Sequence, residues 1–115
     1  TICTHNRTHL FGEVFQGNMR LSALGNLVQQ CWDNMPSHYR NVTLDAFVIM
    51  PNHIHGLLFL QEPVGAGLKP APTRRALPEI IRGLKTFSAR AINEMTDSQG
   101  VPVWQRCYYE HVVRT

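Results

Sequence analysis

Residues 42–60, VTLDAFVIM-PN-HIHGLLFL, are the strongest indication of the fold of this chain. The segments Val42–Met50 and His53–Leu60 are rich in β-branched and other apolar residues, which is typical of strands. Only Pro51 and Asn52 separate them, and a break of this length joins two antiparallel strands in a hairpin. Because both segments are almost continuously apolar, we expect the hairpin to lie at the centre of a sheet rather than at its edge.

The segments before this hairpin predict a strand, a short second hairpin and a helix. Residues 1–4 read as the end of a strand, and residues 13–16 as part of a short hairpin in a loop that contains glycine and asparagine. Over residues 21–35, apolar side chains recur at the i, i+3, i+4, i+7 spacing of an amphipathic helix. We expect Pro36 to end this helix, because a proline disfavours the helical conformation of the residue before it.

The segments after the hairpin predict a linker, a second helix and a last strand. Residues 61–76 are rich in proline and glycine, which is typical of a flexible loop. A second helix is expected with Pro78 near its first turn, where the missing N–H is harmless, and with residues 96–100 closing it. Residues 103–114, VWQRCYYEHVVR, alternate enough to predict a strand.

The order of these elements is β-α-β-β-α-β, which predicts a fold of the α+β class. We expect a ferredoxin-like sandwich, in which two helices cover one face of an antiparallel four-stranded sheet and leave the other face free for a ligand. The 115 residues suit a single domain that spans residues 1–115. Because the chain lacks an initial Met and starts and stops beside expected strands, we expect this domain to be truncated at both ends.

Composition places the chain among globular proteins. Hydrophobic residues make up 43% and charged residues 17%, which argues against a disordered chain. No apolar run reaches the roughly 18 residues that a membrane-spanning helix needs, so no membrane partner is expected. The three cysteines, Cys3, Cys31 and Cys107, lie far apart in apolar patterns and form no CxxC pair. They predict buried free thiols and a cytoplasmic location.

Basic residues gather around and after the proline- and glycine-rich loop. The net charge is only +3, but from Lys69 to Arg90 the lysines and arginines are opposed by Glu79 alone. A local excess of positive charge is typical of a surface that binds a polyanion. An ordinary solvated linker and helix surface explains this charge equally well. The residues that we expect to contact a polyanion are Arg74, Arg75, Arg82 and Lys85.

The motif His53-Ile54-His55 inside the hairpin carries the candidate chemistry. Side chains alternate between the two faces of a strand, so the two histidines should share one face while Ile54 points into the core. Two titratable side chains in an apolar strand need a compensating partner, and a divalent metal held by both imidazoles supplies one. A functional site normally has a third protein ligand. Asp45 and Glu110 are both candidates, and the sequence does not choose between them.

Three segments of the chain together resemble the REP-associated tyrosine transposases, which belong to the single-tyrosine HUH transposases of bacterial insertion sequences. They are MPNHIHGLL at residues 50–58, VWQRCYYEHVVR at residues 103–114, and the opening TICTHNRTHLFGEV at residues 1–14. The first two are specific in combination, and the resemblance covers nearly the whole chain.

The resemblance implies a metal-dependent DNA transposase of the bacterial cytoplasm. His53 and His55 would hold Mg²⁺ or Mn²⁺, which polarises a phosphodiester of single-stranded, hairpin-bearing DNA. A tyrosine hydroxyl would attack the phosphorus and release a free 3′-OH, which leaves the 5′-phosphate bonded to the tyrosine. The 3′-OH of another DNA end would then attack this 5′-phosphotyrosine and release the tyrosine. In the family this tyrosine lies on a later, separate helix, so we expect it beyond Thr115 and expect this chain alone to be inactive. Tyr108 and Tyr109 are interpreted as structural strand residues. A second copy of the chain, in a homodimer, is one partner that the sequence allows.

Two other functions fit parts of the sequence. A non-catalytic RRM-like nucleic-acid-binding module shares the element order and the basic stretch, but it needs exposed aromatic residues where His53-Ile54-His55 stands. A small metal-binding or regulatory domain of the ferredoxin-like type predicts no basic surface near the histidines. The charge around His53 is the feature that separates these two alternatives.

Overall fold

Three helices and two antiparallel sheets make up the described part of the chain, residues 1–60 and 73–111 of the computed structural model. Of residues 73–76 only the backbone is described. The larger sheet has the order β1-β5-β4, with β1 Ile2–Cys3, β4 Val42–Met50 and β5 His53–Leu60. The smaller sheet pairs β2 Gly12–Phe15 with β3 Asn18–Leu21. The helices are α1 Ala23–Asp33, α2 Met35–His38 and α3 Thr73–Thr96, and a 3-10 turn spans His5–Arg7.

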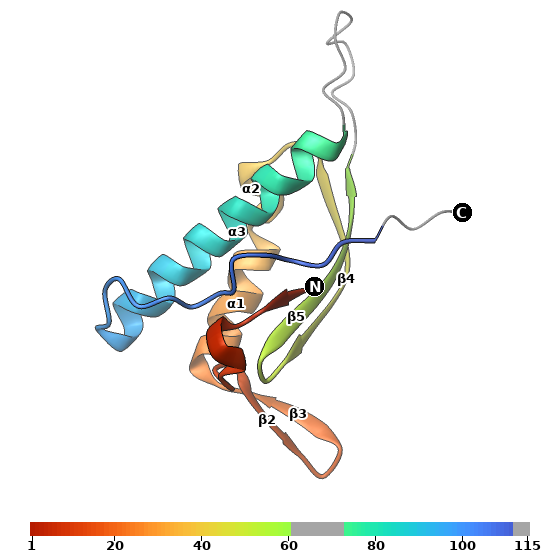
Figure 1. Ribbon diagram of the computed structural model, residues 1–115. Helices are drawn as coiled ribbons and strands as arrows, with labels where there is room; N and C mark the ends of the chain where they lie inside the picture. Colours follow the sequence, from red (N-terminus) through yellow and green to blue (C-terminus); the bar gives the residue numbers. More distant parts are fainter. Residues whose placement is uncertain (61–72, 112–115) are drawn as a thin grey trace, which may run out of the picture.

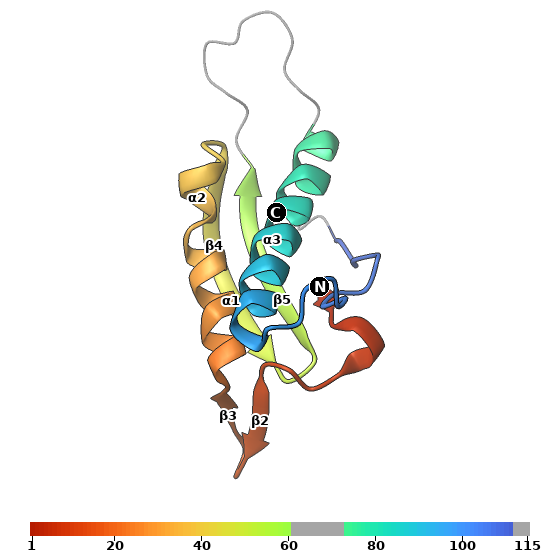
Figure 2. The ribbon, with the colours of Figure 1, turned by 90° about the vertical axis from the view of Figure 1, so that its left-hand side faces the viewer.

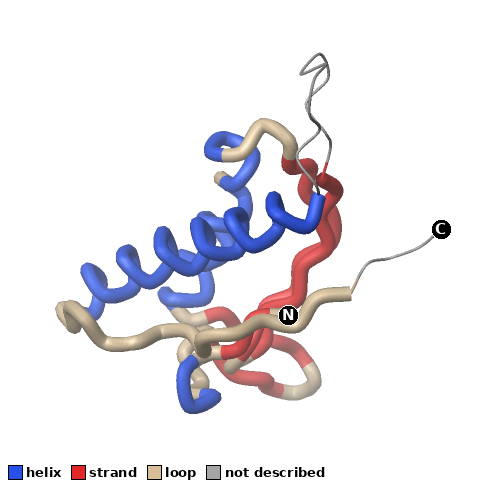
Figure 3. Tube along the Cα trace, turned by 45° about the horizontal axis from the view of Figure 1, so that its top comes forward, coloured by secondary structure: helices blue, strands red, loops and turns tan. Residues whose placement is uncertain are grey.

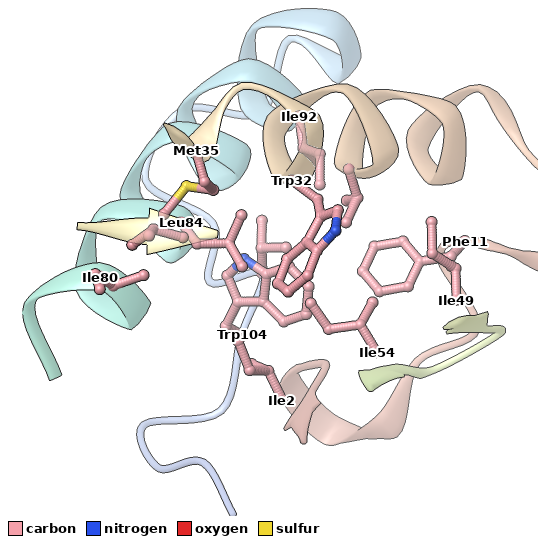
Figure 4. Packing of buried hydrophobic residues seen from close by; sticks show 13 residues of the cluster. Ile2, Phe11, Trp32, Met35, Ile49, Ile54, Ile80, Leu84, Ile92 and Trp104 are labelled. Atoms are coloured by element: carbon pink, nitrogen blue, oxygen red, sulfur yellow. The ribbon is translucent and has the colours of Figure 1, made fainter. Parts of the chain in front are cut away.

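The helices cover one face of the larger sheet. Figure 1 shows α1, α2 and α3 on the same side of β4 and β5, and Figure 2 shows α1 and α3 side by side in front of the sheet. Trp32 from α1, Ile54 from β5 and Leu84 from α3 meet in the layer between them, and each is at most 5% exposed (Figure 4). The α+β class predicted from the sequence is therefore confirmed.

The hairpin of β4 and β5 forms as the sequence predicts. Met50 pairs with His53, so Pro51 and Asn52 make the turn between the two strands. β5 lies between β1 and β4 and is central, but β4 has a partner on one side only among the described strands. The expected central position is thus wrong for β4. The apolar sequence of β4 does not mean that both of its faces are buried, because Val48 is 51% exposed.

The expected last strand over residues 103–114 is wrong for the residues that the structure describes. Within residues 101–111 only Trp104 forms a β-bridge, with Thr4 of the N-terminal segment; residues 112–115 lie outside the description. Trp104 is anchored in the core instead, where its indole N–H donates to Ser88 Oγ at 2.9 Å. The described sheets have three and two strands, so the predicted four-stranded sheet is not confirmed.

Residues 101–111, which we call the tail, nevertheless run antiparallel beside β1. The main-chain nitrogen of Gln105 donates to the Cys3 carbonyl at 2.9 Å, and that of Tyr109 donates to the Thr1 carbonyl at 2.8 Å. Figure 3 shows the tail passing beside the N-terminal residues. Gln105 and Tyr109 are four residues apart, but their partners Cys3 and Thr1 are only two residues apart. The extra residues of the tail therefore bulge out of the ladder. This bulge explains why no regular strand forms.

Two prolines lie elsewhere in the helices than predicted. The first helix begins at the Ser22 cap, whose Oγ accepts the Gly25 N–H, and it already ends at Asp33. Pro36 does not end it but lies in the first turn of α2, where proline is well tolerated. Pro78 lies inside α3, because the helix starts five residues earlier over TRRAL, a segment of good helix formers.

The predicted short hairpin is present as β2 and β3, which project from the body of the molecule (Figure 1). Its turn residues Gln16 and Gly17 have φ angles of 52° and 79°, as a two-residue turn between twisted strands requires. All three cysteines are free thiols, but only Cys3 and Cys31 are half-buried. Cys107 is exposed, so the prediction of burial is wrong for it. Within the described ranges, no helix has the length and apolarity to cross a membrane.

Candidate metal centre

His53 and His55 share the face of β5 that the helices leave open. Ile54 between them is 2% exposed and points into the core, as the alternation along the strand predicts. The two imidazole centroids are 4.7 Å apart, and the ring planes meet at 86°. The predicted orientation of the pair is confirmed, whereas its role as a metal site stays a prediction.

Asn52 orients the imidazole of His53. The amide Nδ2 of Asn52 donates to the Arg7 carbonyl at 3.5 Å, which turns its Oδ1 toward His53 Nδ1 at 2.8 Å. An amide oxygen only accepts hydrogen bonds, so Nδ1 must carry the proton of the neutral ring. The Nε2 atom of His53 therefore keeps its lone pair, which is the arrangement that a metal-binding histidine needs.

Thr1 orients the second imidazole. Thr1 Oγ1 lies 2.7 Å from His55 Nδ1 and forms a hydrogen bond with it. This contact again occupies Nδ1 and leaves Nε2 without a protein partner among the hydrogen bonds of the described residues. Both rings are thus held through the same nitrogen. The Thr1 hydroxyl can accept the proton of His55 Nδ1, and in that tautomer Nε2 of His55 has a lone pair for a ligand, as Nε2 of His53 does.

The charge state of His53 suits metal binding. Partial burial lowers the pKa of His53 below its ordinary value, and the neighbouring His55, the N-terminal ammonium group and Arg7 lower it further. The imidazole is therefore neutral at pH 7, which is the form that binds a metal ion.

A third ligand from the usual metal-binding residues is not present in the described part of the chain. No group of three histidine, cysteine, aspartate or glutamate side chains there could hold a metal. Cys3 lies directly across the ladder from His53, but it does not complete such a group. Neither of the two predicted candidates, Asp45 on β4 and Glu110 on the tail, joins the pair. The described residues thus supply two imidazoles and no carboxylate.

The residues expected to contact DNA phosphates belong to α3 and not to the strands that carry the histidines. Arg82 is exposed on α3, which covers the face of the sheet opposite to His53 and His55. Arg74 and Arg75 lie in the first turn of α3, where side chains are outside the description.

Lys85 has a structural role that the sequence did not suggest. Its ammonium group donates to three tail carbonyls, those of Gln105 at 2.7 Å, Arg106 at 3.1 Å and Cys107 at 3.3 Å. These bonds use the three protons of the ammonium group, so none is left for a phosphate in this conformation. Partial burial also lowers the pKa of Lys85. Lys85 therefore fastens the tail to α3, and its contact with a DNA phosphate stays a prediction.

Sequence reasoning missed three residues of the site. Asn52 stands directly before His53, and its place in the hairpin turn was the signal available for it. Thr1 and Arg7 carry no such signal, because only the pairing of β1 with β5 brings their segment to the histidines. The N-terminal ammonium group and the exposed Arg7 are the fixed cations that act on His53, and no residue of the predicted basic helix is among the causes of its lowered pKa.

Comparison with known proteins gives one relationship. The chain is 39% identical over 128 aligned residues to a protein of Haemophilus influenzae that is described only as an uncharacterized protein. The alignment covers 99% of this chain and 68% of the Haemophilus protein. No protein-family model and no solved structure matches the chain.

Proposed function

The chain belongs to the family of this Haemophilus influenzae protein, and we propose that it acts as the metal-binding core of a single-tyrosine HUH transposase. In this proposal it binds single-stranded, hairpin-bearing DNA in the bacterial cytoplasm and belongs to an enzyme that cleaves and rejoins it through a 5′-phosphotyrosine intermediate. The nucleophilic tyrosine is not assigned to any of the 115 residues.

One observation carries the proposal. Two imidazoles 4.7 Å apart stand on an open sheet face, each bonded through Nδ1 and each with Nε2 left for a ligand. Histidines that bind a metal through one ring nitrogen are typically held by a hydrogen bond to the other nitrogen. His53-Ile54-His55 is also the motif on which the resemblance to HUH transposases rests.

The geometry assigns tasks to this chain's own residues. His53 and His55 would hold Mg²⁺ or Mn²⁺ through their Nε2 atoms, while Asn52 and Thr1 fix the two rings. A divalent cation bound there supplies Lewis-acid stabilisation of the charge that develops on phosphate oxygens. Arg7 adds a positive charge beside His53, which favours an anionic ligand such as a phosphodiester. Imidazole binds a metal ion as a neutral ligand, so a phosphate oxygen would contribute the negative charge that carboxylates provide in other sites.

The arrangement of the strands supports a ferredoxin-like fold as part of the proposal. The tail lies beside β1, and the spatial order is tail, β1, β5 and β4, with antiparallel neighbours. This is the order of a ferredoxin-like sheet in which the fourth strand is replaced by the irregular tail. The histidines lie on the central strand β5, so β1 and β4 on either side can hold their positions.

A second candidate function has its own supporting observation. Phe59 lies on β5 on the same face as the histidines and is 59% exposed. An exposed aromatic residue on a central strand is what a non-catalytic RRM-like module uses to stack bases. Such a module would bind single-stranded nucleic acid without any need for a metal.

Metal dependence of DNA binding separates the candidates. We expect Mn²⁺ to tighten the binding of a fluorescent single-stranded hairpin DNA to the 115-residue chain, compared with the same titration in EDTA. Anisotropy at several salt concentrations measures this, because phosphate contacts also weaken steeply with salt. Equal affinity with Mn²⁺ and EDTA would favour the RRM-like module, and Mn²⁺ binding without any gain in DNA affinity would favour a metal-binding regulatory domain. Denaturing electrophoresis of the same samples is expected to show no covalent adduct.

A further inference from the structure

Tyr109 faces the same side of the sheet as the histidine pair. Its main-chain nitrogen donates to the Thr1 carbonyl at 2.8 Å, and the main-chain nitrogen of Thr1 donates to the Tyr109 carbonyl at 2.7 Å. Residues that exchange both bonds lie directly opposite each other in an antiparallel pair, and their side chains point to the same face. Since the Thr1 side chain points to His55, Tyr109 also projects from the open face.

The two neighbouring tyrosines of the tail have different surroundings. Tyr108 is half-buried and packs against the hydrophobic core. Tyr109 is 66% exposed, so its ring contributes little to the core. A tyrosine ring has an apolar face and a polar hydroxyl, and such rings are enriched where proteins bind other molecules. The exposure of Tyr109 thus leaves its ring available to a ligand of the open face.

The backbone of Tyr109 is held in place although its ring is exposed. The reciprocal bonds with Thr1 fix it on one side, and Lys85 fastens the three residues from Gln105 to Cys107 just before it. An aromatic ring on a fixed backbone loses less conformational freedom when it binds a ligand than a ring on a free segment.

We propose that Tyr109 is a stacking platform for a nucleobase of the single-stranded DNA whose phosphate binds at His53 and His55. This proposal rests on the proposed function and adds the residue that holds a base. Tyr109 and His55 belong to one row across the sheet with Thr1 between them, so their Cα atoms lie two strand spacings, about 10 Å, apart. A nucleotide laid across Thr1 would put its phosphate near the imidazoles and a base near the ring. Every base offers a face for such stacking, so the site would tolerate different sequences.

The geometry favours stacking over nucleophilic attack by Tyr109. Two main-chain bonds to Thr1 pin this residue, whereas a nucleophile that cleaves and rejoins must move between DNA ends. Stacking needs the ring alone, and attack on phosphorus needs the hydroxyl. Tyr109→Phe and Tyr109→Ala therefore separate the two roles.

The test compares DNA binding by these variants with Mn²⁺ present. Tyr109→Ala is expected to weaken binding of a short single-stranded oligonucleotide by about 5- to 150-fold, the usual effect of losing one stacked base. Tyr109→Phe should bind as the unchanged chain does. Phe15→Ala is the matched control, because it removes a ring that is 44% exposed on the separate β2–β3 hairpin. It should leave binding unchanged.

Oligonucleotides that lack a single base identify the stacked position. The unchanged chain should lose affinity when one particular base is missing, and Tyr109→Ala should be insensitive to that same loss. Unchanged binding by Tyr109→Ala, or an equal loss with Phe15→Ala, would overturn the stacking role while leaving the proposed function intact. A covalent adduct that disappears in Tyr109→Phe would overturn it in favour of a nucleophile. If the unchanged chain binds no single-stranded DNA, both proposals fail.

Discussion

Replacing both site histidines, as His53→Ala with His55→Ala, is expected to remove the Mn²⁺-dependent part of single-stranded DNA binding. The described residues provide the two Nε2 atoms as metal ligands, and the double variant lacks both. Asn52 and Thr1 remain, but the imidazoles that they orient are gone. We expect the affinity for Mn²⁺ to fall by more than about 100-fold, the upper end of what losing only an outer partner costs. Each single variant should lose most of this affinity, because one imidazole rarely holds a divalent ion. Calorimetry with Mn²⁺ and anisotropy with labelled DNA measure the two losses.

The matched control is His9→Ala, which removes an exposed imidazole from the loop before β2. It should leave both affinities unchanged. The salt-dependent binding that persists in EDTA should be the same in all variants, since it depends on phosphate contacts rather than on the metal. Retention of Mn²⁺-dependent DNA binding by the double variant, with its circular dichroism spectrum unchanged, would contradict the assignment of the pair.

Asn52→Leu is expected to weaken Mn²⁺ binding by about 10- to 100-fold, the range found when an outer partner of a metal-binding histidine is lost. Leucine has nearly the same shape but offers no acceptor to His53 Nδ1, which Asn52 Oδ1 now contacts at 2.8 Å. Without that acceptor the proton is free to move to Nε2, the nitrogen that must bind the metal. The main-chain bond from Thr4 to the Asn52 carbonyl, 2.9 Å long, does not depend on the side chain and should keep the turn in place.

Asn52→Asp is the informative companion, because a carboxylate still accepts the Nδ1 proton. It should keep the affinity that Asn52→Leu loses. Nitrogen-15 shifts of the imidazole report directly which nitrogen of His53 carries the proton. If the tautomer is the same in Asn52→Leu and in the unchanged chain, Asn52 is only a turn residue and the orienting role is wrong.

Local patterns were enough to predict most of the helices and strands. The β4–β5 hairpin follows from two apolar segments around Pro51 and Asn52, and α1 follows from its helical spacing, because both are set by near neighbours in the chain. The tail is different. Its alternating sequence is typical of a strand, but residues 105–107 bond to Lys85, the Trp104 indole bonds to Ser88, and the tail bulges beside β1. Such long-range bonds leave no mark on local periodicity.

The same distinction explains what could be predicted of the site. The shared face of His53 and His55 follows from alternation along a single strand. Thr1 and Arg7 approach the pair only because β1 pairs with β5 in one particular register, Cys3 opposite His53. Sequence spacing alone cannot give that register. Charge counted along the chain also does not reveal that the ammonium group of Lys85 binds carbonyls of its own chain.

Paramagnetic broadening by Mn²⁺ tests most directly whether His53 and His55 form a metal site. Imidazole signals of the isotope-labelled chain are recorded as Mn²⁺ is added in amounts well below the protein concentration, first alone and then with single-stranded hairpin DNA. We predict that the signals of His53 and His55 broaden before those of the other histidines, His5, His9, His38 and His111, and that DNA strengthens the effect. Broadening that spares His53 and His55, or that begins at another histidine with and without DNA, would contradict the metal site and the function proposed for it.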